Sequence, residues 1–276
     1  MLPDRVLEIL NEMKAERIRG ATWLARKGAE AFLALAEELD EALLEDAIRE
    51  LRSRIIEVNP SMASLYNLAR FMPITNNREL VKMRALEFLR RMDEAKRELA
   101  SIGAQLIDDG DVIITHSFSS SVLEIFKVAK DRRKSFKVII TESSPDYEGL
   151  HLANELENLG IEFEVITDSQ MGLFCRKATI SMVGADMVTR DGFVVNKAGT
   201  YLLALACHES DVPFYVAAET YKFHPTVKSN EVVLHERDFS RSGFRVRNVL
   251  FDLTPWKFIR GIITELGIVI PPRDIQ

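Results

Sequence analysis

Through the first hundred residues, apolar positions recur every three or four residues, which is the spacing of amphipathic helices. Val6, Leu10 and Met13 share one face of a helix predicted over residues 4–18. Further helices are predicted over residues 21–39, 43–58, 61–72 and 77–107. The last of these is full of paired opposite charges, which stabilise a long helix. The pattern therefore predicts a helical N-terminal domain.

From residue 111 onward, short runs rich in β-branched residues alternate with helical patterns. Strands are predicted over 111–116, 136–141, 162–167, 178–185, 214–218 and 248–254, with amphipathic helices such as 146–160 and 199–210 between some of them. Continuous apolar strands that alternate with helices are typical of a parallel sheet covered on both faces. We therefore predict an α/β protein, with a helical N-terminal domain over residues 1–105 and a Rossmann-like parallel-sheet domain over residues 106–276.

Unusual polar residues follow the predicted strands directly. Thr115-His116-Ser117 ends the first strand, Gly184-Ala185-Asp186 ends the fourth, and Glu219 follows the fifth. In open α/β sheets, ligands bind at the carboxyl ends of the strands. The sequence therefore predicts a ligand site at this edge of the sheet.

Several common motifs of α/β enzymes are absent from the sequence. No GxGxxG, GxxxxGK, HExxH or GxSxG pattern occurs. Dinucleotide binding, P-loop nucleotide hydrolysis, zinc proteolysis and the α/β-hydrolase reaction are thereby disfavoured. We expect neither a cofactor nor a metal ion.

Composition and charge limit the possible partners and the cellular location of the protein. A net charge of −6 argues against broad nucleic-acid binding. Cys175 and Cys207 lie far apart in the sequence and form no CxxC pair, so a disulfide or zinc site is not expected and both are predicted to be buried. The charged, helical start differs from a signal peptide, and no apolar run is long enough to span a membrane. We therefore expect a cytoplasmic protein, and the wealth of Glu, Lys and Arg favours a thermophile.

The segment 183–206 carries the most candidate chemistry. Asp186 could transfer a proton or bind sugar hydroxyls, and it could equally be a strand-end turn residue. Asn196 and Lys197 precede a helix that begins near Gly199, where free amides would attract an anion such as phosphate. The alternative is that a simple hairpin turn precedes Asn196 and Lys197 and that both are solvated.

The loop after the first strand is rich in hydroxyl groups. Ser117, Ser119 and Ser120 lie at a predicted helix start, where several serines with backbone amides suit a phosphate. Ordinary N-capping explains one or two of them without any function. His116 is expected to pack or to orient the loop. Lys222 could face the same pocket, although its position alone favours a surface lysine.

Four ordered stretches resemble one known family. The stretches "ITHSFSSSVLEIF", "TESSPDYEGLHLA", "VGADMV…NKAGTY" and "PFYVAAETYKF" are similar, in order and spacing, to regulatory subunits of translation initiation factor 2B. That superfamily also holds isomerases of methylthioribose-1-phosphate and ribose-1,5-bisphosphate. The similarity covers nearly the whole chain, and "TESSPDYEG" is most similar to an archaeal alpha-type subunit.

The resemblance implies a pocket between the two domains and a dimer formed through the C-terminal domain. It implies that Arg19, Gly20 and Ala21 meet a ligand phosphate and that Asp186 occupies the position of the isomerase acid/base. It also implies that Asn196, Lys197 and Lys222 occupy ligand-binding positions.

Two positions depart from the isomerase pattern. Ser117 stands where the isomerases have a cysteine, and an alkanol cannot cycle protons near neutral pH without an adjacent base. Asn59 stands where they carry a phosphate-binding arginine. Asp186 is kept, so the resemblance implies a retained pocket with impaired or altered isomerase chemistry.

Two functional hypotheses follow. The first is a regulatory subunit that forms a homo-oligomer, contacts translation initiation factor 2, and binds a phosphorylated sugar or a nucleoside monophosphate. It would contact neither nucleic acid nor a membrane and would not exchange nucleotide alone. The second is an aldose-1-phosphate to ketose-1-phosphate isomerase that uses Asp186, with Ser117 or a water in place of the thiol.

Overall fold

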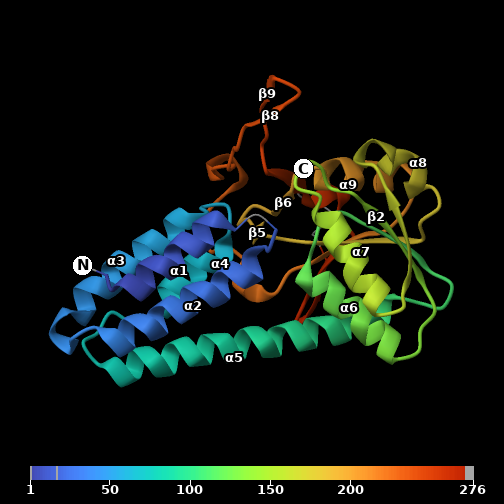
Figure 1. Ribbon diagram of the computed structural model, residues 1–276. Coiled ribbons are helices and arrows are strands. Elements are labelled where there is room, and N and C mark those ends of the chain that lie inside the picture. The colour runs from blue at the N-terminus through green and yellow to red at the C-terminus, as the bar shows by residue number, and fades with distance from the viewer. Residues whose placement is uncertain (1, 17, 271–276) are drawn as a thin grey trace.

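The helical half of the molecule comes first along the chain (Figure 1). The computed structural model describes residues 2–16 and 18–270. The helical half contains α1 (Asp4–Ala15), α2 (Ala21–Glu38), α3 (Glu41–Val58), α4 (Ala63–Phe71) and α5 (Arg78–Gly103). Val6, Leu10 and Met13 are buried, as the apolar spacing predicted. No helix in this described part of the chain is both long and apolar enough to cross a membrane.

The second half is built on a mainly parallel sheet in the order β12-β11-β7-β4-β1-β2-β3. Its strands are β1 (Val112–Thr115), β2 (Lys137–Thr141), β3 (Glu162–Ile166), β4 (Ile180–Gly184), β7 (Phe214–Ala217), β11 (Gly261–Thr264) and β12 (Gly267–Val269). Only the pairing of β12 with β11 is antiparallel within this sheet. The predicted α/β fold class, with a helical first part and a parallel sheet after it, is confirmed.

Both faces of this sheet are covered, which explains why its strands are continuous apolar runs. Ile113 and Val138 point into a core with α6 (Ser120–Asp131) and α7 (Glu148–Asn158), while Ile114 and Ile139 point into a core with α8 (Met171–Cys175) and α9 (Thr200–Glu209). Consecutive residues alternate between the two cores because side chains of a strand point to opposite faces.

Helix α5 belongs to both halves. Phe88 and Met92 pack into the core of the helical half, and Leu99 and Ala100, further along the same helix, pack against the sheet. The domain boundary at residue 105 stays a prediction, because this one helix carries core residues of both halves.

The sixth predicted strand has a different place from the one expected. Residues 248–254 were predicted together with the strands of the parallel sheet, but β10 (Phe251–Pro255) pairs antiparallel with β6 (Phe193–Lys197), which pairs with β5 (Met187–Val188). Met187, Val195 and Phe251 of this three-stranded sheet are buried in the helical core. The small sheet therefore joins the two halves, and β11 and β12, which the sequence pattern missed, complete the large sheet.

The two cysteines are neighbours despite their separation in the sequence. Their sulfur atoms are 3.1 Å apart, on α8 and α9, and both thiols are free. The prediction that they are buried is confirmed. The contact arises because α8 and α9 pack against the same face of the sheet.

Candidate functional site

A cavity of about 630 Å³ lies between the helical half and the carboxyl ends of the strands. It gathers nearly all the predicted site residues, which are Arg19, Gly20, Ala21, Ser117, Ser119, Ser120, Asp186, Asn196, Lys197 and Lys222. Gly199 is the predicted residue that does not line the cavity. Predicted residues from five separate segments thus meet at the sheet edge where the strand-end pattern predicted a ligand site.

Ser117 lies at a sharp bend after β1. Its φ of 65° is left-handed, which is uncommon for a residue with a side chain, and its amide donates to Ser143 Oγ at 2.8 Å. The buried His116, which precedes Ser117, holds this bend in place through two hydrogen bonds. Its Nδ1 is 2.6 Å from Thr141 Oγ1, and its Nε2 is 2.9 Å from the carbonyl oxygen of Ala198.

The hydrogen bonds of His116 determine which ring nitrogen carries the proton. A carbonyl oxygen only accepts, so Nε2 carries the hydrogen and Nδ1 accepts from Thr141. Burial lowers the pKa of His116 and so favours the neutral ring. His116 therefore orients the loop, and both of its ring nitrogens are occupied.

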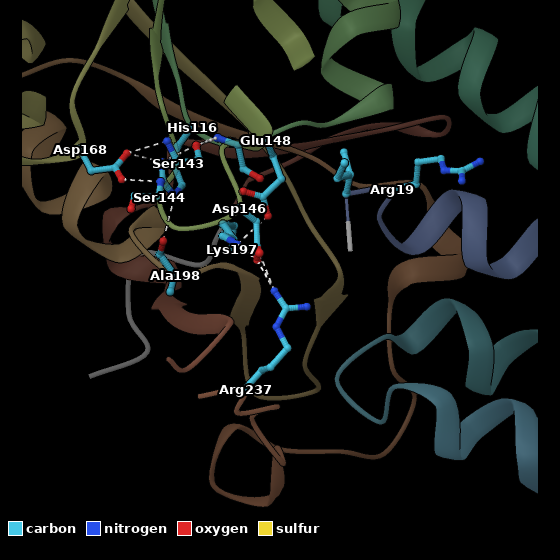
Figure 2. Close-up of polar contacts among 12 residues, drawn as sticks. Arg19, His116, Ser143, Ser144, Asp146, Glu148, Asp168, Lys197, Ala198 and Arg237 are labelled. Carbon is cyan, nitrogen blue, oxygen red and sulfur yellow. Dashed lines mark hydrogen bonds and ion pairs between the residues drawn. The ribbon is translucent and has the colours of Figure 1, made fainter. Parts of the chain in front are cut away.

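Asp168 anchors the neighbouring loop and was missed from the sequence. Its two carboxylate oxygens accept from the amides of Ser143 and Ser144, at 2.9 and 2.8 Å (Figure 2). Asp168 lies two residues after the end of β3, so the rule of polar strand ends could have found it. These bonds hold the loop that in turn supports Ser117.

The serines of the loop divide between capping and the cavity wall. Ser119 Oγ caps α6 by accepting from the amide of Val122 at 3.3 Å, as the capping alternative proposed. Buried Ser121 does not line the cavity, and its Oγ donates to Glu219 Oε1 at 2.7 Å. Ser120 lines the cavity without a capping role.

Lys222 and Glu219 form a buried ion pair beside these serines. Lys222 is 3% exposed, and its Nζ lies 2.8 Å from Glu219 Oε2. The expectation of a surface lysine was wrong, because the turn after β7 directs this side chain inward. Burial alone would raise the pKa of Glu219, but Lys222 and Ser121 outweigh it and lower that pKa.

A second group of charges closes the opposite part of the cavity, and we name it the Lys197 cluster: Lys197, Glu148, Asp146 and Arg237. Lys197 Nζ lies 2.5 Å from Glu148 Oε1 and 3.5 Å from Asp146 Oδ2. Arg237 Nη2 contacts both Asp146 oxygens, at 2.5 and 2.6 Å (Figure 2). Lys197 is only 7% exposed, so the alternative of a solvated lysine was wrong. Burial raises the pKa of Glu148.

The start of α9 is already occupied. The amides of Gly199 and Tyr201 donate to Asp252 Oδ2 at 2.7 and 3.1 Å, so these two amides are not free for a ligand. Asn196 Nδ2 donates to Thr200 Oγ1 at 2.9 Å. The Asp252 carboxylate thus binds at the helix terminus where the sequence predicted a ligand anion.

Asp186 and Arg19 face the cavity from the strand end and the start of α2. Burial raises the pKa of Asp186 to about 6, although Lys222 and the amide of Ala21 oppose this shift. A carboxyl group with such a pKa can exchange a proton near neutral pH. Arg19 contacts Glu16 at 2.8 Å and stacks on Trp23, 4.2 Å from the ring centre.

The sequence missed the carboxylates and the arginine of the Lys197 cluster. Asp146 and Glu148 follow the second predicted strand closely, which was a usable signal. Arg237 had none, because it lies in the long irregular stretch after β7. The described residues contain no group of three or more His, Cys, Asp or Glu side chains suited to hold a metal ion.

Comparison with known proteins decides the family. The sequence profile of the initiation factor 2 subunit family matches residues 17–271. The chain belongs to this family. A family member from Pyrococcus horikoshii, named as a translation initiation factor eIF-2B subunit 2-like protein, is 79% identical over 276 residues and the full length of both chains. A ribose 1,5-bisphosphate isomerase from Archaeoglobus fulgidus is 36% identical, over 98% of this chain and 91% of its own.

Solved structures agree with this fold. A translation initiation factor eIF-2B crystal structure from Pyrococcus horikoshii OT3 has a TM-score of 0.98, at 79% identity and full coverage of both chains. A 5-methylthioribose 1-phosphate isomerase from the same organism has a TM-score of 0.77 at 23% identity, over 97% of this chain and 85% of its own, and so shares the fold. The resemblance found in the sequence is confirmed, and the family contains both factor-like and isomerase members.

Proposed function

We propose that this family member is an alpha-type regulatory subunit of the translation initiation factor 2B kind, with a pocket for a phosphorylated sugar or a nucleoside monophosphate. The proposal also includes a cytoplasmic homo-oligomer formed through the C-terminal half, contact with translation initiation factor 2, and no direct contact with nucleic acid or membrane. The 79% identical relative named as an eIF-2B subunit 2-like protein supports this proposal.

The observation that carries this proposal is the environment of Ser117. A serine hydroxyl becomes a proton carrier or nucleophile only beside a base. The adjacent His116 cannot be that base, because Thr141 and the Ala198 carbonyl occupy its two ring nitrogens. The cavity keeps its polar walls, so binding without turnover is the function that this geometry supports best.

Two measurements test the regulatory function. In calorimetric titration, ribose 5-phosphate and adenosine 5′-monophosphate provide the two ligand classes, and at least one should bind stoichiometrically. In a GDP-release assay with the cognate initiation factor 2, the purified chain should bind the factor without accelerating release. Release accelerated by this chain alone, or no binding of the factor, would contradict the proposal.

A second candidate function is sugar-phosphate isomerisation, and Asp186 is the observation that favours it. Its pKa of about 6 suits proton transfer between neighbouring sugar carbons near neutral pH. The 36% identical relative named as a ribose 1,5-bisphosphate isomerase adds support. Turnover of ribose 1,5-bisphosphate followed by NMR, lost in Asp186→Asn and kept in Asp131→Asn, would favour this function. Absence of turnover in the unmodified protein would exclude it for that sugar.

A further inference from the structure

The Lys197 cluster is balanced in charge before any ligand arrives. Its two cations, Lys197 and Arg237, face two carboxylates, Asp146 and Glu148, and every cation of the cluster contacts a carboxylate of the cluster. A phosphate gains little from a buried ammonium that a buried carboxylate already neutralises, as Glu148 does for Lys197. Figure 2 shows the cluster gathered on one side and Arg19 apart from it across the view.

A phosphate placed against Lys197 would meet a buried carboxylate at the same point. Glu148 Oε1 is 2.5 Å from Lys197 Nζ, so a phosphate bonded to this ammonium would lie beside a group that carries the same sign of charge. Juxtaposed like charges away from bulk water are strongly unfavourable. The phosphate would bind here only if it displaced Glu148.

Glu148 also has an unused acceptor. It is 5% exposed and lines the cavity, and its Oε2 has no hydrogen-bond partner among the described residues. A buried acceptor left without a donor costs free energy, so a ligand that supplies an O–H donor gains by filling it. Asn196 also lines the cavity.

We propose that the Lys197 cluster receives a hydroxyl group of the ligand and rejects phosphate, so that the pocket selects a sugar monophosphate over a bisphosphate. The single phosphate then lies at the other wall, formed by the loop of Ser119 and Ser120 and by Arg19. Arg19 also contacts a carboxylate, that of Glu16, but its side chain is 53% exposed and can turn toward a ligand, unlike the buried Lys197. This inference rests on the proposed function and adds Glu148 as the residue that sets ligand specificity.

Titration calorimetry with two sugars that differ by one phosphate tests the inference. Ribose 5-phosphate and ribose 1,5-bisphosphate are titrated into the full chain, into Glu148→Gln, and into Glu157→Gln as a control from the exposed side of the same helix. The unmodified chain should bind the monophosphate about tenfold more tightly, and Glu148→Gln should shift the ratio of the two affinities toward the bisphosphate by about tenfold. Glu157→Gln should leave that ratio unchanged.

Tighter binding of the bisphosphate by the unmodified chain overturns the inference and leaves the proposed binding function standing. An affinity ratio in Glu148→Gln equal to that of Glu157→Gln overturns it as well. If Glu148→Gln does not fold, as judged by its thermal transition, Asp146→Asn replaces it, because it also removes a carboxylate from beside Lys197. Binding of neither sugar overturns the sugar-phosphate pocket itself, and the inference with it.

Discussion

At the scale of single residues, the site is defined by burial of charge. Asp186, Glu148 and Asp252 are carboxyl groups whose pKa values burial raises, to about 6 for Asp186 and Asp252. Glu219 shows the opposite outcome, because a close lysine outweighs burial and lowers its pKa. Glu148 keeps a raised pKa although Lys197 lies 2.5 Å away, so burial and the nearby ammonium group together set the direction of each shift.

Asp186 should make stability depend on pH. Its folded pKa of about 6 lies above the ordinary 3.8, so its contribution to stability is full below pH 3.8 and is lost as the pH rises to 6. The loss is on the order of 3 kcal/mol from 1.36 kcal/mol per pKa unit. Urea unfolding between pH 4 and 8 should show a smaller decline in Asp186→Asn than in the unmodified chain. Asp252 leaves a residual slope in the variant, and identical slopes in both proteins would contradict the pKa of Asp186.

Asp168 should support the site from outside the cavity. Asp168→Asn places an amide group against the amides of Ser143 and Ser144, where the carboxylate accepts from both. The free energy of unfolding should fall by roughly 1–3 kcal/mol, and ligand affinity should fall with it because the loop also positions Ser117. Chemical denaturation and calorimetry measure the two effects. The exposed Asp131→Asn serves as control, and equal behaviour of the two variants would remove the anchoring role.

At the scale of elements, the sequence predicted most of the strands correctly but did not predict which strands pair with one another. The strands β1, β2, β4 and β7 were found because buried parallel strands are continuous apolar runs bounded by polar ends, and β3, at the sheet edge, was found although glutamates interrupt its apolar residues. Residues 248–254 show a similar pattern of apolar residues, yet β10 pairs antiparallel with β6. An apolar run shows that a strand is buried but does not name its partner, which here is fixed by packing of Phe251 against the helical half.

The fit of α7 on β2 gives a prediction at this scale. A Cβ on Gly149 would lie 1.8 Å from the carbonyl oxygen of Thr141, so the helix that carries Glu148 would have to move away from the strand. Gly149→Ala should lower the free energy of unfolding by roughly 1–3 kcal/mol, as overpacking does. Gly172→Ala is the matched control, since a Cβ there meets no atom within 4 Å. Thermal and urea unfolding distinguish them, and a Gly149→Ala variant as stable as Gly172→Ala would contradict this close packing.

At the scale of the whole molecule, the cavity arises from contacts that no local pattern contains. The strand-end rule and the family resemblance predicted the site residues, and all of them except Gly199 line the cavity. They did not reveal that the chain's own carboxylates neutralise Lys197 or occupy the start of α9, because Asp146, Arg237 and Asp252 approach from separate segments. The charge balance of a site between two halves depends on the tertiary fold, so it cannot be predicted from the spacing of residues in the sequence alone.

The proposed oligomer through the C-terminal half can be tested on two exposed leucines. Leu173 on α8 and Leu202 on α9 are 62% and 63% exposed, and these two helices pack together on one face of the sheet. Burying a leucine contributes about 1.5–3 kcal/mol, so two aspartates in their place would disfavour a subunit contact on this face. Sedimentation velocity should show a dimer or a higher oligomer for the unmodified chain and a monomer for Leu173→Asp/Leu202→Asp.

A matched variant separates this surface from a general effect of added charge. Leu86 on α5 is 57% exposed but belongs to the helical half, so Leu86→Asp should leave the oligomer intact. All three proteins should keep the same helical content, because none of these side chains belongs to a buried core. A monomeric unmodified chain, or an oligomer that survives both aspartates on α8 and α9, would place subunit contact elsewhere. Dissociation by Leu86→Asp alone would instead place it on the helical half, and ligand titrations of that variant would show whether the cavity depends on the partner subunit.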